Sequence, residues 1–156
     1  MDWLKASSAV EPEGFGVSLG HFILRVAVGL MVFYIHGWHK LEGGIAYLQH
    51  GTPWQLVADV TAMHFPAPVA SAIAATIVQF VCSWFVVVGL FTRLNALLLV
   101  GALSGAILQN LMAGRDPQLA ILYTLVITAT LVFMGGGRFS LDYHWFKLNN
   151  RQPLRT

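Results

Sequence analysis

The sequence predicts an all-α integral membrane protein, a four-helix bundle with an external helical lid between the first and second helices. Its composition is 56% hydrophobic and 10% charged, with a mean hydropathy of +0.66. Soluble domains of this size carry roughly 25% charged residues. Four apolar stretches long enough to approach a bilayer width are separated by polar or glycine-rich turns. The ionisable residues of the first stretch also share one helix face, as the interior of a bundle would require.

The first predicted span runs from Leu19 to Leu41 and carries an unusual number of polar residues for a membrane helix. At about 100° per residue, its polar and small residues fall within a stripe roughly 80° wide. The stripe contains His21, Arg25, Gly29, Val32, His36 and His39. A charged group in a bilayer costs several kcal/mol unless it reaches water or protein, so this stripe is expected to face the other helices.

The segment from Glu42 to Pro68 is semi-polar and too short in its apolar parts to span a membrane. Gly43 and Gly44 are expected to end the first helix, and a second short helix is expected after Thr52 and Pro53. Its aromatic residues suit a headgroup boundary, so the sequence predicts an interfacial or re-entrant lid.

The remaining spans follow in order, at about residues 68–90, 94–111 and 118–134. Gly101 and Gly105 in the third span form a pattern of small residues that lets two helices approach closely, although chance explains it equally well. These limits divide the chain into an N-terminal cytosolic arm (1–18), a membrane domain (19–142) and a basic cytosolic tail (143–156).

Four spans place both termini on one side of the membrane. Counting the basic residues by side gives seven on the terminal side against two on the other. The positive-inside rule then predicts cytosolic termini in the cell membrane. The net charge of +2 does not indicate a nucleic-acid partner, because the basic residues lie at span ends. The single cysteine, Cys82, excludes an internal disulfide.

Several motifs together resemble the DoxX family of small four-helix bacterial and archaeal membrane proteins. They are Arg25 with Gly29, HGWHKL from His36, the PAP turn before the second span, GLFTR after it, and GGGRFSLD from Gly135. The resemblance covers roughly residues 19–142. It implies an association with membrane oxidoreductases, because the family includes small subunits of thiosulfate:quinone oxidoreductase and of archaeal quinol oxidases.

The chain departs from the family pattern where the family has groups that can carry protons. Gln79 stands in place of a glutamate in the second span, Gln109 or Asn110 in place of a histidine, and Gln118 in place of an acidic residue. Amides can hydrogen-bond a ligand but cannot transfer protons. This substitution pattern weakens any proton-coupled role for the chain itself.

The first functional hypothesis is a quinone-linked redox subunit. His36 and Lys40 are expected to bond a quinone carbonyl, Gln79 to offer an amide deeper in the membrane, and Trp38 or Trp54 to flank the ring. The alternative is a structural role, in which His36 and Lys40 only anchor the end of the helix. No metal or haem is expected, because the later spans contain no histidine and zinc needs three or four ligands.

Two further hypotheses remain open. The chain could be a non-catalytic anchor or assembly subunit, either beside a redox protein or as a homo-oligomer, and the amide replacements favour this. A small-molecule transporter is the weaker alternative, because no inverted repeat is evident. Independently of function, Arg25 and Asp142 are predicted to form a structural ion pair at the cytosolic side.

Overall fold

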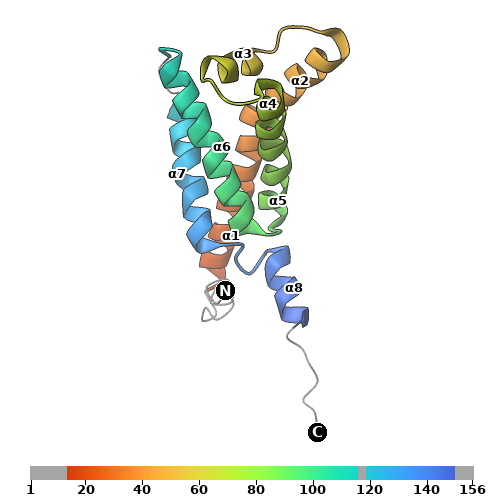
Figure 1. The fold of residues 1–156 in the computed structure, drawn as a ribbon. Helices are drawn as coiled ribbons and strands as arrows, with labels where there is room; N and C mark the ends of the chain where they lie inside the picture. Colours follow the sequence, from red (N-terminus) through yellow and green to blue (C-terminus); the bar gives the residue numbers. More distant parts are fainter. Residues whose placement is uncertain (1–13, 116–118, 150–156) are drawn as a thin grey trace.

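The computed structural model describes residues 14–115 and 119–149, and within these ranges the chain contains helices and no strands (Figure 1). Two stretches, η2 and η3, are π-helical and continue neighbouring α-helices. The elements are α1 (Phe15–Met31), η2 (Val32–Trp38), α2 (His39–His50), α3 (Gln55–Ala62), α4 (Pro68–Ile77), η3 (Val78–Cys82), α5 (Ser83–Val88), α6 (Thr92–Met112), α7 (Leu119–Met134) and α8 (Leu141–Asn149).

Three continuous helices in the described ranges are long and apolar enough to cross a membrane. They are Phe15–His50 with 36 residues, Pro68–Val88 with 21 and Thr92–Met112 with 21. The last two agree with the predicted second and third spans to within a few residues. Helix α7 occupies the predicted fourth span and has 16 residues, or about 24 Å at the usual helical rise.

The first helix is longer at both ends than the sequence pattern predicts. It begins at Phe15 after Gly14, so residues 15–18 of the predicted arm are helical and Ser18 is buried within the helix. Gly43 and Gly44 do not end it, contrary to the prediction. The helix continues to His50 and is ended by Gly51, which adopts the left-handed conformation. Residues 1–13 of the predicted arm and 150–156 of the predicted tail lie outside the described residues.

Gly43 and Gly44 instead provide a flat surface on which the side chain of Trp54 packs. A Cβ atom at Gly43 would lie 2.9 Å from Cδ1 and Nε1 of Trp54, and one at Gly44 would lie 3.1 Å from its Cη2. Trp54 forms a small apolar cluster with Leu56, Val60 and Ala72, which fixes α3 against α4. Figure 1 shows α3 lying across the end of the long helices.

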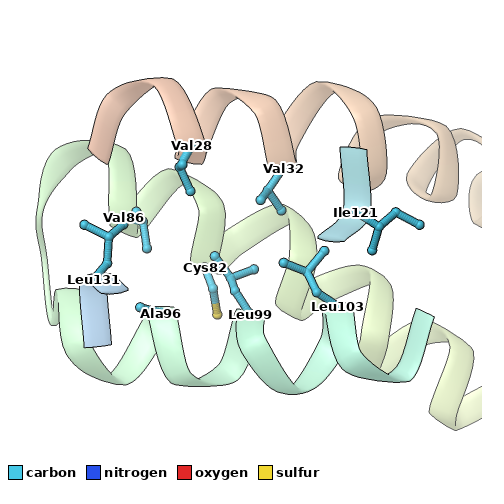
Figure 2. Close-up of a cluster of buried hydrophobic side chains, with 9 residues drawn as sticks. All are labelled: Val28, Val32, Cys82, Val86, Ala96, Leu99, Leu103, Ile121 and Leu131. Carbon is cyan, nitrogen blue, oxygen red and sulfur yellow. The ribbon is translucent and has the colours of Figure 1, made fainter. Parts of the chain in front are cut away.

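The main apolar core lies between the long helices, where side chains from α1, η2, η3, α5, α6 and α7 meet (Figure 2). It consists of Val28, Val32, Cys82, Val86, Ala96, Leu99, Leu103, Ile121 and Leu131. Thr124 and Thr128 of α7 are also fully buried. The hydroxyl of Thr128 donates to the carbonyl of Thr124 at 2.6 Å, the backbone bonding typical of membrane threonines.

Close helix approach does not involve the Gly101 and Gly105 pattern of the sequence. A Cβ at either position would meet nothing within 4 Å among the described residues, and both glycines are exposed. Gly29 makes the close contact instead, because a Cβ there would lie 2.9 Å from the carbonyl oxygen of Ser83. The first helix therefore packs tightly on α5.

Candidate functional site

The polar stripe predicted on the first helix faces the interior over most of its length. His21, Arg25, Val32 and His36 are all buried, and Arg25 is only 1% exposed. His39 breaks the pattern, because its side chain is 77% exposed and lies 3.7 Å from Glu42. The π-helical turns of η2 contain more residues per turn than an α-helix, so the register of the face changes before His39 is reached.

The two π-helical segments pack against each other at Gly37. A Cβ at this glycine would lie 3.4 Å from the carbonyl oxygen of Gln79 and 3.4 Å from the Cα of Phe80. The lack of a side chain at Gly37 lets η2 and η3 approach with their backbones almost touching. Short π-helical segments in long helices occur frequently at functional sites.

Two buried polar side chains on these facing segments have atoms without a hydrogen-bond partner. The Nε2 atom of His36 has none, and neither the amide nitrogen nor the amide oxygen of Gln79 has one. Gln79 is fully buried and His36 is 7% exposed. Buried polar atoms are normally hydrogen-bonded, since an unsatisfied group costs on the order of 1–3 kcal/mol. The chain's described residues therefore leave these three atoms without a hydrogen bond.

A group of aromatic rings covers the outer surface of the same segments and was not predicted from the sequence as a group. Phe33 is central, with ring centroids 5.1 Å from Tyr34, 6.0 Å from Trp38, 4.9 Å from Phe80 and 5.2 Å from Trp84. Tyr34, Trp38 and Trp84 are exposed. We refer to these five residues as the aromatic surface. In the sequence these residues form two clusters at helical spacing, one in each of two helices, and nothing in the pattern indicates that the two clusters meet.

The other predicted ligand residues are divided between two places. Trp38 belongs to the aromatic surface beside His36. Lys40 is half-buried at the start of α2, where the carboxylate of Asp59 attracts its ammonium group. Trp54 is 7% exposed and packed on Gly43 and Gly44, so it forms part of the α2–α3 contact. The predicted flanking role therefore suits Trp38 better than Trp54.

Arg25 lies at the opposite end of the first helix, where it connects α1 to the turn after α7. Its guanidinium donates to the carbonyl oxygens of Gly136 and of Phe139, the latter at 2.8 Å. It also lies against Gly89, which has a φ of +76° and where a Cβ would be 2.5 Å from the guanidinium. A glycine is required there by both the conformation and the space.

Asp142 lies at the same junction but binds the start of α6. Its carboxylate accepts from the backbone nitrogen of Phe91 at 2.7 Å, and from the backbone nitrogen of Thr92 at 2.9 Å. The predicted direct ion pair is absent from the contacts of these two described residues, because Arg25 donates to backbone carbonyls and Asp142 accepts from Phe91 and Thr92. Their charges are still near enough to attract each other across the junction.

A third polar cluster, centred on Asp59 of α3, was missed by the sequence analysis. Its carboxylate accepts from Gln55 at 2.9 Å, from Arg115 at 3.1 Å, and from Gln109 of α6. Burial by itself would raise the pKa of Asp59, but these three hydrogen bonds and the charge of Arg115 lower it below its ordinary value of 3.8. Gln109 therefore has a structural partner, in addition to its place in the family pattern.

The comparisons with known proteins give one match. The model of the DoxX family matches residues 20–113, which is more than half of the chain. The chain belongs to the DoxX family. No curated protein and no solved structure matches it.

The DoxX match extends from α1 to the end of α6, so it includes η2, η3, the aromatic surface and Asp59. It does not include the GGGRFSLD motif after α7. Together with the three apolar helices, membership indicates a multi-pass membrane protein in contact with lipid. In the described ranges, no three residues among His, Cys, Asp and Glu are grouped as metal ligands would be.

Proposed function

We propose that this DoxX protein is a four-helix membrane subunit of, or partner to, a quinone-linked oxidoreductase, and that it contacts the quinone at the η2–η3 seam. The observation that carries the proposal is that Nε2 of His36 and the amide of Gln79 are buried without hydrogen-bond partners, on two π-helical segments in contact. In this proposal α7 is the fourth span, and α3 with its flanking loops is the interfacial lid.

The chemistry of the residues fits a quinone head. Neutral imidazole donates from one ring nitrogen, and an amide donates from its NH₂ group, so His36 and Gln79 each offer a hydrogen bond to a carbonyl oxygen. The aromatic surface supplies flat, apolar rings for a head group that approaches from the lipid. Sites of this type are mostly apolar, with a few polar groups that fix orientation.

A bound quinone would supply two-electron redox chemistry, and the chain's own residues would hold and orient its head. The amide of Gln79 can only hydrogen-bond the head, whereas the imidazole of His36 is the one group of this pair that can also transfer a proton to it. The electron donor would then belong to a redox partner. Lys40, near the same end of the helix, adds a positive charge that favours a reduced, anionic head.

We propose that the protein lies in the cell membrane of a bacterium (its inner membrane) or an archaeon, with both termini in the cytosol. The distribution of basic residues supports this orientation, and it puts α3 and Lys40 on the external side.

The test is the quinone content of the protein after purification in mild detergent with added quinone. His36→Ala and Gln79→Leu each remove a hydrogen bond worth on the order of 1 kcal/mol, so retention should fall about fivefold. His39→Ala and Gln49→Leu are matched controls, because both side chains are exposed on the same helix. They should retain quinone like the wild type.

A packing role for His36 gives the opposite result. Thermal stability in detergent would fall in His36→Ala while quinone retention stayed at the wild-type level. Equal retention in His36→Ala and His39→Ala would refute the proposed site, leaving the anchor or assembly subunit as the function.

A further inference from the structure

A groove of about 390 Å³ lies at the end of the molecule away from α3, between the first turn of α1 and α8. Phe15 and Ser18 of α1 form one wall, and Tyr143, His144 and Lys147 of α8 form the other. The turn containing Arg138 and Phe139 closes the groove between them. Figure 1 shows α8 at the same end of the molecule as the start of α1.

Among the described residues that line this groove, the charged groups are basic. Arg138 and Lys147 line it, together with the imidazole of His144, and none of the lining residues that the structure describes is acidic. Lys147 lies over the ring of Tyr143, 5.8 Å from its centroid. The first turn of α1 contains no acidic residue either, so the partial positive charge of this helix end adds to the two cations. The groove therefore favours an anion.

Ser18 gives independent evidence for a hydrogen-bonding ligand. Its side chain is 2% exposed and belongs to the wall of the groove, yet its hydroxyl has no partner. A serine inside a helix normally bonds its hydroxyl to the carbonyl four residues earlier or to water. An unpaired hydroxyl in a basic groove is expected where an oxygen atom of a ligand accepts its hydrogen bond.

The rim of the groove is apolar on the side of α1. Phe15 is 71% exposed and meets Phe139 edge-to-face, with centroids 6.1 Å apart. Phe22, one helical turn beyond Ser18, also contacts Phe139 at 6.0 Å. Since the continuous helix that begins with α1 is long and apolar enough to span a membrane, this aromatic rim continues onto a surface that faces lipid. The anion expected here is therefore joined to an apolar chain.

We infer that this groove binds the phosphate group of an anionic phospholipid, with the acyl chains lying along Phe15, Phe22 and Phe139. The phosphate oxygens accept from Lys147, from Arg138 and from the hydroxyl of Ser18. Basic side chains at a membrane surface recognise anionic headgroups in this way. The inference does not depend on the quinone proposal, because it concerns other residues at the other end of the chain.

The experiment is native mass spectrometry of the full chain, released from detergent after incubation with equal amounts of phosphatidylglycerol and phosphatidylcholine. The wild type should retain phosphatidylglycerol in preference to phosphatidylcholine. Lys147→Gln should reduce this preference about fivefold, the usual effect of one basic side chain at an anionic surface. Ser18→Ala should reduce it severalfold without changing the net charge.

Arg115→Gln is the charge-matched control, because Arg115 follows α6 at the opposite end of the molecule. It should keep the wild-type preference. Equal retention of the two lipids by the wild type would refute the inference, and so would equal effects of Lys147→Gln and Arg115→Gln. A thermal shift with glycerol 3-phosphate as large as that with phosphatidylglycerol would identify a site for soluble phosphate esters and overturn the lipid assignment.

Discussion

Asp59 and Arg115 form an ion pair across 56 positions of sequence, with 3.1 Å between the carboxylate oxygen and the guanidinium nitrogen. The pair connects α3 to the residues that follow α6. Gln109 donates to the same carboxylate oxygen as Arg115, and Gln55 holds the other oxygen. Asp59 keeps only 13% of its side chain exposed, so the pair is shielded from solvent on the carboxylate side.

The Asp59 cluster predicts that stability depends on pH in the acid range. The pKa of Asp59 is lowered on folding from its ordinary value of 3.8, so its contribution is fully present above that value. It is lost as the pH falls through the still lower folded value. Wild-type thermal stability in detergent should therefore decrease as the pH falls below about 4. Asp59→Asn should be less stable at pH 7 and should show a smaller decrease, whereas parallel curves would contradict the prediction.

Gly43→Ala should destabilise the contact between α2 and α3. The new methyl group would lie 2.9 Å from the indole of Trp54, which is buried and has little room to move. Overpacking of this kind costs about 1–3 kcal/mol. Gly101→Ala is the control, because its methyl group would meet nothing within 4 Å and alanine is the better helix former. Comparison of the two melting temperatures tests the contact, and equal values would refute it.

A double-mutant cycle at Arg25 and Asp142 should give a small coupling energy. Arg25→Leu removes two hydrogen bonds to the turn after α7, and Asp142→Asn weakens the cap of α6. Because the partners are different backbone groups, the two losses should add to within about 1 kcal/mol. The measurement is the free energy of unfolding of the four variants in mild detergent. A coupling of several kcal/mol would instead establish a direct ion pair.

The orientation of the chain can be tested with reporter fusions. Alkaline phosphatase folds only outside the cytosol, so a fusion after Thr156 should be inactive and one near Gly51 should be active. The opposite pattern would place α3 and Lys40 in the cytosol and reverse the orientation proposed above.

Helical periodicity was sufficient to predict the buried face of the first helix from His21 to His36. It failed at His39, because periodicity assumes α-helical turns and η2 is π-helical. No residue type marks a π-helical segment, so a sequence pattern cannot reveal where the register changes. For the same reason, the sequence did not reveal that η2, which contains His36, contacts η3, which contains Gln79.

Glycines were the other source of error in the predicted fold, because a glycine can either end a helix or leave room for a neighbouring side chain or helix. Gly43 and Gly44 were predicted to break the first helix, yet they remain helical and accommodate Trp54. Gly101 and Gly105 match a packing pattern, yet a Cβ atom at either position would meet nothing within 4 Å in the described chain. Long-range partners such as Asp59 and Arg115 also lie beyond sequence reasoning, since nothing local relates two residues on separate elements.

The unbroken helix from Phe15 to His50 fixes the distance between two of its contacts, at Arg25 and at Gly43. Arg25 is tied to the turn after α7, and Gly43 is tied to Trp54. Eighteen residues separate them, or about 27 Å of helix, which is close to the hydrocarbon thickness of a bilayer. Because the helix cannot stretch, a thicker membrane must thin locally around the protein and a thinner one must tilt it. We therefore expect the position of α3, which lies at one end of this helix, to depend on the thickness of the membrane.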